Sequence, residues 1–384
     1  MISKKKQPGV PEQHATRAIF FVGGFGAASW APLVPLLKAR LGIAEDVLGM
    51  LLLCIGIGSL LTMPLSGAAA VRLGCRKVLT AAGLVYAALL LLLCTVSSFG
   101  MAVPLLLIFG ATMGCIDVVV NIQAVIVEKA AGRRLMSGMH ALWSVGGFAG
   151  AGLFGIWVGS FSLTPLLSTI IAAAIMVLVT LAASRHLLPY GGDAGGKLLA
   201  LPKGIVTFVG IIACIAFLVE GAIMDWGGVF LTTVRHFDMS LAGTAFTVFS
   251  AAMLTMRLFG DWTVQKLGQE RVVIGGSLLA VAGFLLVIFA AEPALLYLGF
   301  FAIGIGCANV VPVFFSLLGK QRVMPVSLAV PAVSTLGYLG ILMGPAVIGF
   351  IAHQTSLYTA FGLLAFLVLL QSIIAAYVYR HILD

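Results

Sequence analysis

The chain has 384 residues, of which 61% are hydrophobic and 9% are charged, and its mean hydropathy is +1.16. Soluble domains average about 45–50% apolar and about 25% charged residues, so this chain has too few polar residues to cover a water-soluble globule. The composition predicts an integral membrane protein and excludes soluble enzymes, nucleic-acid-binding proteins and disordered proteins. The net charge of +9 is therefore interpreted as a signal of membrane topology, not of affinity for nucleic acid.

A membrane-spanning helix needs about 20 mostly apolar residues. Twelve such spans are predicted, over 18–37, 47–70, 78–97, 102–127, 136–159, 164–184, 204–231, 241–260, 272–290, 294–318, 325–352 and 356–379. If the N-terminus is cytoplasmic, only Lys38, Arg40 and Arg235 of the 22 basic residues lie outside. Basic residues gather on the cytoplasmic side of membrane proteins, so this bias predicts that both termini are cytoplasmic.

Gly- and Pro-rich residues 185–203 lie between the sixth and seventh spans and are typical of a flexible linker. We therefore predict an all-α membrane protein with an N-terminal six-helix bundle over 1–184, a cytoplasmic linker over 185–203 and a C-terminal six-helix bundle over 204–384. The two halves also repeat. RLGCRKV, which starts at residue 72, matches KLGQERV at an offset of 194, and GCIDVV, which starts at residue 114, matches GCANVV at an offset of 192. Two matches at nearly one offset indicate internal duplication and two pseudo-symmetric bundles.

The loop after the second span reads GAAAVRLGCRK over 67–77. It resembles the loop signature of the major facilitator superfamily, Gly-x-x-x-Asp-Arg-x-Gly-x-Arg-Arg/Lys. The aspartate position holds Val71 here and Gln265 in the second copy, which departs from the family pattern. The resemblance covers the whole chain and implies twelve helices in two halves, nested inverted repeats, a midplane cavity and transport by alternating access.

Charged side chains near the middle of a span are functional candidates, because inserting one costs at least about 2.5–3.5 kcal/mol. The acids in such positions are Asp117, Glu220 and Asp225, and we expect them to take part in proton coupling. Asp117 and Asn121 are four residues apart and so share a helical face. The repeat makes Asn309 the counterpart of Asp117, which predicts an asymmetric polar site. The alternatives are that Asp117 is a protonated acid bonded to nearby backbone, and that Asp225 only caps or gates the outer vestibule.

The spacing of Gly114, Asp117 and Asn121 is similar to the Gly-x-x-Glu-x-x-x-Asn motif of fucose-permease-like sugar/proton symporters. MHALWSVG over 139–146 and EGAIMDW over 220–226 resemble a neighbouring bacterial branch that includes a rhizopine-associated transporter. These resemblances imply a sugar- or inositol-like solute and proton coupling. The first helix of fucose permease carries an acid that this chain lacks, so Glu220 or Asp225 would have to replace it.

Other polar and aromatic side chains in the spans are expected to contact the solute, because amides suit hydroxyl groups and aromatic rings stack on sugars. The predicted substrate-binding residues are Trp30, Asn121, His140, Trp143, Trp226, Asn309 and Tyr338. Membrane tryptophans also serve in packing and at the lipid interface, and His140 and Tyr338 can equally bond their own surroundings. Both interpretations of these residues stay open at this stage.

Charges near the predicted cytoplasmic loops form a second group, predicted to make a gate: Arg72, Arg76, Glu128, Arg257, Glu270 and Lys320. The repeat sets Arg76 against Glu128 and Glu270 against Lys320 with the signs exchanged, which predicts two ion pairs. We expect Arg257 to pair with Asp261 one turn away. The alternative is that these charges are solvated and contribute little to stability.

Sequence motifs for ATP binding, zinc proteases and metal clusters are absent, so we expect no enzyme activity, no metal and no cofactor. The predicted function is a secondary active transporter of a bacterial inner membrane, a monomer in lipid that uses the proton gradient to move a small-molecule substrate. Two alternatives stay open. One is a proton-driven drug or metabolite exporter, which the 24 phenylalanines would suit, and the other is a transporter-like nutrient sensor.

Overall fold

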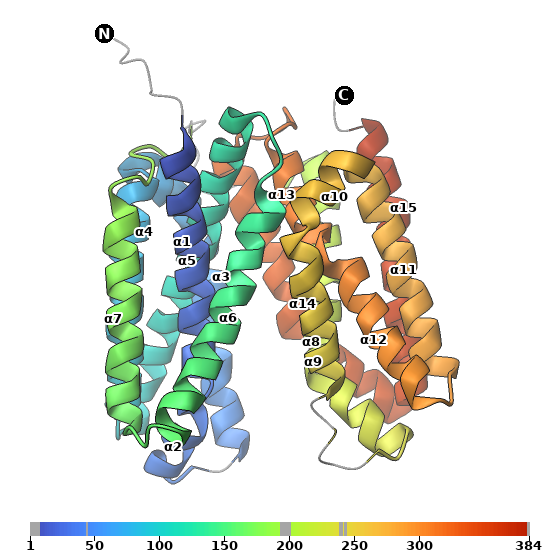
Figure 1. The fold of residues 1–384 in the computed structure, drawn as a ribbon, viewed down its shortest axis with the longest axis horizontal. Helices are drawn as coiled ribbons and strands as arrows, with labels where there is room; N and C mark the ends of the chain where they lie inside the picture. The colour runs from blue at the N-terminus through green and yellow to red at the C-terminus, as the bar shows by residue number, and fades with distance from the viewer. Residues whose placement is uncertain (1–7, 44, 193–200, 238–240, 242–243, 382–384) are drawn as a thin grey trace. The chain divides into compact units, whose positions relative to one another are not determined.

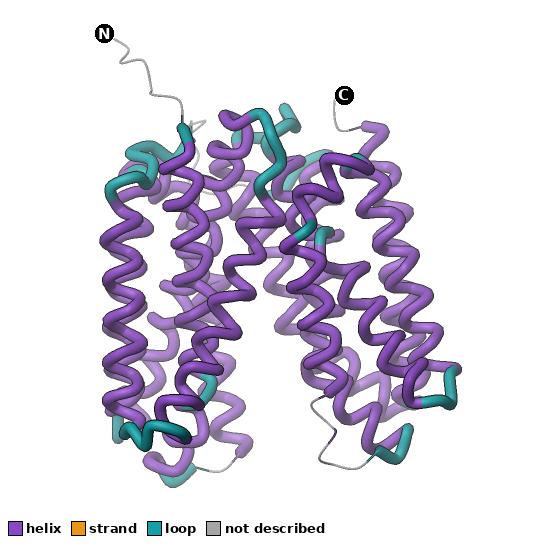
Figure 2. Tube along the Cα trace, viewed as in Figure 1, coloured by secondary structure: helices purple, strands orange, loops and turns teal. Residues whose placement is uncertain are grey.

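The computed structural model describes residues 8–43, 45–192, 201–237, 241 and 244–381. Within these ranges the chain forms helices and loops and no strand (Figure 2). Ten helices of the described part are long and apolar enough to cross a membrane. A spanning helix satisfies all its interior backbone hydrogen bonds within one segment, which is why an apolar chain of this kind folds as helices. Residues 193–200 of the predicted linker lie outside the described residues.

The first six spans comprise seven helices (Figure 1): α1 (Val10–Trp30), α2 (Leu33–Leu41), α3 (Glu45–Leu73), α4 (Cys75–Thr95), α5 (Phe99–Ala131), α6 (Met136–Gly159) and α7 (Pro165–Ser184). The first span is broken after Trp30, where Pro32 cannot donate a helical hydrogen bond. Helix α3 packs along α5, and α4 lies between α5 and α7. Between α3 and α4 the chain turns at Gly74, whose φ of +84° suits glycine.

The last six spans comprise the remaining elements: α8 (Ile205–Val229), the π-helical turn η1 (Phe230–Val234), α9 (Thr244–Leu258), α10 (Gly260–Leu267), α11 (Gln269–Phe289), α12 (Pro293–Ala308), α13 (Val310–Leu318), α14 (Val326–Gln354) and α15 (Leu357–His381). Helix α11 packs against α12 and α15, and α9 packs against α12. The eighth span is broken at Phe259 and the tenth at Asn309. The predicted twelve-helix architecture is thus confirmed, with three spans divided into two helices each.

The chain divides into two compact units. The N-terminal unit comprises residues 1–135, 139–200 and 325–331, and the C-terminal unit comprises 136–138, 201–324 and 332–384. Each unit has its own buried core; that of the C-terminal unit includes Phe249, Phe284, Phe300 and Phe361, all at most 1% exposed.

The first part of the predicted linker is folded against the N-terminal unit and is not a free connection. Leu187 and Leu188 are buried, and the backbone amide of Arg76 donates to the carbonyl of Leu188 at 2.7 Å. A Cβ atom at Gly74 would lie 2.2 Å from the carbonyl oxygen of Pro189. Glycine is therefore required at 74 both by its backbone angle and by the close passage of this segment. We call residues 185–191 the strap.

Two arginines at equivalent places in the two halves, Arg40 in the last turn of α2 and Arg235 just after η1, cap equivalent helices of the two units. Arg40 donates to the carbonyl of Val96 at 2.8 Å, just after the end of α4. Arg235 donates to the carbonyls of Val287 and Ile288 at 2.8 and 2.7 Å, at the end of α11. The last carbonyls of a helix lack partners within it, so a guanidinium there satisfies them. The two arginines are 195 residues apart, close to the offsets of the sequence repeat.

Candidate functional site

The polar centre of the N-terminal unit is Asn121 on α5, which is fully buried. Its side-chain amide donates to Asp117 Oδ1 at 3.3 Å and to the Asp117 carbonyl at 2.9 Å, as the four-residue spacing predicts. Its Oδ1 lies 3.2 Å from Nε2 of His140 on α6. The structure therefore joins three of the predicted site residues in one hydrogen-bonded chain.

The direction of this chain follows from the chemistry of the amide. An amide oxygen only accepts, so Nε2 of His140 is the donor and carries the proton in this arrangement. His140 therefore donates a hydrogen bond to Asn121, and Asn121 donates one to Asp117. An asparagine amide has no ionisable proton to pass on, so the chain orients Asp117 and His140 relative to each other without relaying a proton between them. The His140 ring also contacts Phe20 at a centroid distance of 4.9 Å.

The tryptophans of the N-terminal unit have packing partners. Trp30 is 6% exposed, and its ring lies 5.9 Å from that of Phe109. Trp143 covers α1, where a Cβ atom at Gly24 would lie 2.0 Å from the Trp143 carbonyl oxygen. Its ring would meet a Cβ atom at Gly23 at 2.3 Å. Of the two, only Trp143 retains partial exposure, so it is the better placed to reach a solute.

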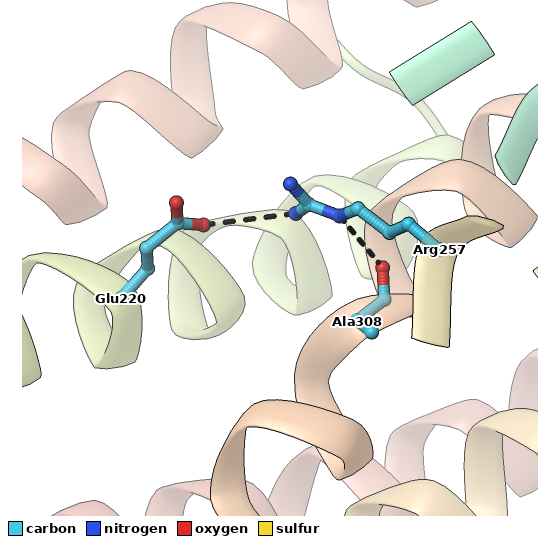
Figure 3. Close-up of polar contacts among 3 residues, drawn as sticks. All are labelled: Glu220, Arg257 and Ala308. Atoms are coloured by element: carbon cyan, nitrogen blue, oxygen red, sulfur yellow. Dashed lines mark hydrogen bonds and ion pairs between the residues drawn. The ribbon is translucent and has the colours of Figure 1, made fainter. Parts of the chain in front are cut away.

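The charged centre of the C-terminal unit joins three helices (Figure 3). Glu220 projects from α8 and Arg257 from α9, with Oε2 and Nη2 3.9 Å apart. Nε of Arg257 donates to the carbonyl of Ala308 at 3.1 Å, at the end of α12. Arg257 is buried, whereas the Glu220 side chain is 33% exposed. The predicted gate residue Arg257 therefore lies beside a predicted proton-coupling acid.

Asn309 occupies the break between α12 and α13, with φ −101° and ψ 0°. Its side chain is 3% exposed, and neither its nitrogen nor its oxygen has a hydrogen-bond partner among the described residues. A Cβ atom at Gly260 would lie 2.2 Å from Asn309 Oδ1, so this side chain lies against the start of α10. An unpaired buried amide is costly, which makes Asn309 a candidate for a group that changes partners.

The remaining predicted residues of the C-terminal unit lie on α8 and α14. The ring of Trp226 faces Gly349, and Tyr338 packs edge-on against Phe217 at a centroid distance of 6.2 Å. Asp225 is exposed on α8, five residues after Glu220. These residues therefore lie on two helices of the C-terminal unit, α8 and α14.

The predicted ion pair between Arg76 and Glu128 is wrong. Arg76 donates instead to the carbonyls of Leu187 and Arg185, at 3.0 and 2.7 Å, and so holds the strap. Glu128 accepts the backbone amide of Leu135 at 2.8 Å, in the loop before α6. Both side chains serve backbone groups left unpaired near helix ends, which satisfies more hydrogen bonds than an exposed ion pair would.

The equivalent pair in the C-terminal unit is also wrong. Lys320 donates to Gln269 at 3.0 Å, and Gln269 in turn donates to Ser316 at 3.2 Å. Glu270, the predicted partner, is exposed one residue further on. Arg72 is exposed as well. The sequence repeat located the right loop and helix end but not the contacting residue.

Asp261, the predicted partner of Arg257, binds backbone amides. Its two carboxylate oxygens accept from the N–H groups of Ser137 and Gly138, each at 2.9 Å, within the residues assigned to the C-terminal unit. The N-terminal end of a helix carries a partial positive charge, so it stabilises a carboxylate that binds its first-turn amides. Within the described residues, no group of three or more His, Cys, Asp or Glu side chains could hold a metal ion.

Comparison with known proteins identifies the family. The sequence model of the Major Facilitator Superfamily matches residues 18–321 and 209–382. The chain belongs to this superfamily. It is 47% identical to an uncharacterised MFS-type transporter of Yersinia pestis over 366 residues, covering 94% of each chain. It is also 29% identical over 346 residues to the membrane protein MosC of Rhizobium meliloti, covering 88% of this chain and 83% of MosC.

Solved structures of the superfamily share the fold. The E. coli fucose:proton symporter FucP matches with a TM-score of 0.79 at 15% identity, covering 96% of this chain and 98% of FucP. The human organic anion transporter MFSD10 matches with a TM-score of 0.74 at 19% identity, covering 95% and 99% of the two chains. The superfamily is a family of transporters, so the protein is a multi-pass membrane transporter.

Two features of the site escaped the sequence analysis. One is Gln123, fully buried on α5, which donates to Thr16 of α1 and accepts the amide of Leu188 in the strap. The other is the pairing of Arg257 with the Ala308 carbonyl. Pro312 was the available signal, because a proline leaves the carbonyl four residues before it without its helical donor.

Proposed function

We propose that the protein is a secondary active transporter that moves a small polyhydroxylated solute, such as a sugar or an inositol derivative, by alternating access. Transport is coupled to protons, and the proton gradient replaces any cofactor as the energy source. The protein works as a monomer in a bacterial inner membrane, and both its termini lie in the cytoplasm.

The observation that carries this proposal is the chain of His140, Asn121 and Asp117. A hydroxyl group both donates and accepts, so a ring N–H, an amide and a carboxyl group on neighbouring helices suit a polyol. Asp117 is partly exposed, which leaves its carboxyl group accessible to a solute. An ionised carboxyl group only accepts, whereas the protonated form also donates. The hydroxyl pattern that binds best therefore changes when Asp117 takes up a proton.

The known proteins support the same class of solute. FucP is named a fucose:proton symporter, and XylE, which matches with a TM-score of 0.70, is named a proton:xylose symporter. At 15% and 14% identity these matches concern the fold, so the substrate class rests on the polar chain. Glu220 is the second acid available for coupling, since its side chain is one-third exposed.

The test is solute binding to the purified protein in lipid nanodiscs, followed by tryptophan fluorescence. The probes are fucose, xylose, myo-inositol and the lipophilic cation tetraphenylphosphonium, each at pH 5.5 and pH 7.5. Asp117→Asn is the test variant. Thr112→Val is the matched control, because Thr112 lies on the same helix and donates to the carbonyl of Ile108 in its own turn.

Saturable quenching by a sugar or by inositol that weakens in Asp117→Asn but not in Thr112→Val is the expected result. The same solute should then drive proton movement into proteoliposomes. A response to tetraphenylphosphonium alone would overturn the substrate class in favour of a drug exporter. Solute binding without any flux in proteoliposomes would favour a nutrient sensor.

A further inference from the structure

Gln123 joins α5 to α1 and to the strap. It is fully buried on α5, its Nε2 donates to Oγ1 of Thr16 on α1 at 2.9 Å, and its Oε1 accepts the backbone amide of Leu188 at 3.1 Å. A side-chain amide has donors at one end and an acceptor at the other, so one residue satisfies both neighbours. Thr16 is fully buried too and donates in turn to the carbonyl of Glu12.

The strap is also bound by the start of α4. Arg76 donates from its side chain to the carbonyls of Arg185 and Leu187, and its backbone amide donates to the carbonyl of Leu188. Both leucines are buried. The strap is therefore tied to α4 by Arg76 and to α5 by Gln123. All of these residues belong to the N-terminal unit.

Helix α1 in turn supports the helix that carries His140. Phe20 lies one turn after Thr16, is fully buried and contacts the His140 ring. A Cβ atom at Gly146 or Gly150 of α6 would clash with a backbone carbonyl oxygen of α1. Helices in such close backbone contact move together, because neither can shift toward the other without overlap. The position of α6 therefore follows that of α1.

The hydrogen bond between His140 and Asn121 spans α6 and α5. Its length of 3.2 Å is at the upper end of the usual range for a bond from nitrogen to oxygen, so a small separation of the two helices breaks it. Gln123 lies two residues after Asn121 on α5 and holds this helix to α1. The contact between Gln123 and Thr16 thus supports the polar chain from outside it.

The second half of the chain differs at the corresponding positions. At the repeat offset of 192, Gln123 corresponds to Phe315, which is buried. At the offset of 194, Gly74 corresponds to Gly268, and their φ angles are +84° and +86°. The strap passes over Gly74, whereas no atom of the described residues lies within 4 Å of a Cβ atom at Gly268. A phenylalanine fills such a position without burying a polar group, so a glutamine there indicates a need for its hydrogen bonds.

We propose, on the basis of the solute site proposed above, that Gln123 is a positioning residue that sets the reach of His140 to Asn121. With the strap in place, Gln123 keeps α1, and α6 with it, at the distance from α5 that this hydrogen bond requires. When Gln123 loses its partners, the helices shift and His140 loses the acceptor that fixes its proton on Nε2. The strap therefore influences solute affinity through Gln123 and not through a solute contact of its own.

The first test is a ¹⁵N spectrum of the full-length protein, labelled in its six histidines and measured in nanodiscs at pH 8.5 without solute. The ¹⁵N shift separates a ring nitrogen that carries a proton from one that does not. The His140 signals are those that disappear in His140→Gln. In the wild type we expect the proton on Nε2, as the bond to Asn121 requires, and a proton on Nδ1 would overturn the inference.

Three variants test the role of the Gln123 contacts in this spectrum. Gln123→Met removes both hydrogen bonds at similar volume, and Thr16→Val removes the bond to α1 alone. Both should show a fraction of His140 with the proton on Nδ1. Thr16→Ser keeps the hydroxyl group and should restore the wild-type spectrum.

Gln371→Met is the matched control for the loss of a buried amide. Gln371 is a buried glutamine on α15 of the C-terminal unit and donates to Ser277 at 3.0 Å. Its replacement costs a comparable hydrogen bond and should leave the His140 spectrum unchanged. A structural role of Gln123 alone would lower Tm in both methionine variants and leave His140 unchanged in both.

The second test is the affinity for fucose, xylose and myo-inositol, measured by tryptophan fluorescence in the same nanodiscs. Gln123→Met and Thr16→Val should bind the polyol that the wild type binds about fivefold more weakly, the effect of one hydrogen bond. Arg76→Gln, which frees the strap from α4, should weaken binding in the same direction. Thr16→Ser and Gln371→Met should bind like the wild type.

The outcomes separate this inference from the proposed function. A proton that stays on Nε2 of His140 in both Gln123→Met and Thr16→Val would refute the positioning role, and so would an equal change in Gln371→Met. Equal polyol affinity of Gln123→Met and the wild type would refute it and leave the proposed function supported. A wild type that responds to no polyol would refute the substrate class, while a variant-dependent His140 spectrum would still support the positioning role.

Discussion

Replacing Arg235 by glutamine should destabilise the C-terminal unit more than any other substitution of an arginine in its loops. Arg235 donates from one nitrogen to the carbonyls of Val287 and Ile288, and its guanidinium lies 5.6 Å from the ring centroid of Phe230 and 5.5 Å from that of Tyr358. These contacts join η1, the end of α11 and the start of α15. Removing the guanidinium breaks all of them together.

The magnitude follows from the kinds of contact. Hydrogen bonds to a charged group contribute about 1.5–3 kcal/mol, and a cation over an aromatic ring adds about 0.5–1 kcal/mol. Glutamine can keep one neutral bond, worth about 1 kcal/mol. The two bonds and two ring contacts together contribute about 4–8 kcal/mol, so the net loss is at least about 3 kcal/mol, which corresponds to a fall in Tm of at least about 6 °C for a unit of this size.

The assay is thermal unfolding of the detergent-solubilised protein followed by intrinsic fluorescence. Arg271→Gln is the matched control, because Arg271 is an exposed arginine on the same helix that Arg235 caps. Arg235→Lys should fall between the two, since lysine keeps the charge but not the planar fork. If Arg235→Gln lowers Tm by about 2 °C or less, as a surface substitution does, the capping argument is refuted.

Two further predictions concern the N-terminal unit. Gly24→Ala should lower Tm by at least about 3 °C, because the new Cβ would lie 2.0 Å from a backbone oxygen, whereas Gly147→Ala, with nothing within 4 Å, should leave Tm unchanged. Arg76→Gln should release the strap and speed hydrogen exchange of residues 187–190 about thirtyfold, because two hydrogen bonds of about 1 kcal/mol each are lost. Lys77→Gln, the exposed neighbour, should exchange like the wild type, and equal rates in the two variants would contradict the role of Arg76.

The number and the order of the spans could be predicted because they depend on composition and length alone. The breaks within them are harder to predict from sequence. Pro32 and Pro312 accompany breaks, yet Pro64 and Pro104 lie inside the continuous helices α3 and α5. A proline removes one hydrogen bond wherever it occurs, and the packing around it determines whether the helix ends.

The charged contacts show a different limit. The pairing of Arg257 with Asp261 stays a prediction, and it would have to span the break at Phe259, because α9 ends at Leu258 and α10 begins at Gly260. The pairing of Arg76 with Glu128 rested on the repeat, which sets charges of exchanged sign at matching positions of the two halves. A guanidinium equally satisfies carbonyls at a helix end, and nothing in the sequence shows that the strap folds back over residue 76. The short-range pair of Asp117 and Asn121 was predictable because both residues lie on one unbroken helix.

The duplication separates the parts of the protein that maintain its fold from those that differ between the halves. Arg40 and Arg235 have kept the same capping role in both units, and so both copies of the sequence serve a structural requirement. The polar positions within the spans have diverged. In the alignment of the two halves, Asp117 corresponds to Asn309 and Met63 corresponds to Arg257. The caps recur in both halves, whereas the proton-coupled transport proposed above uses an acid, an amide and a cation in unequal places. The residues that break the repeat inside the apolar spans are therefore the ones to which transport should be most sensitive.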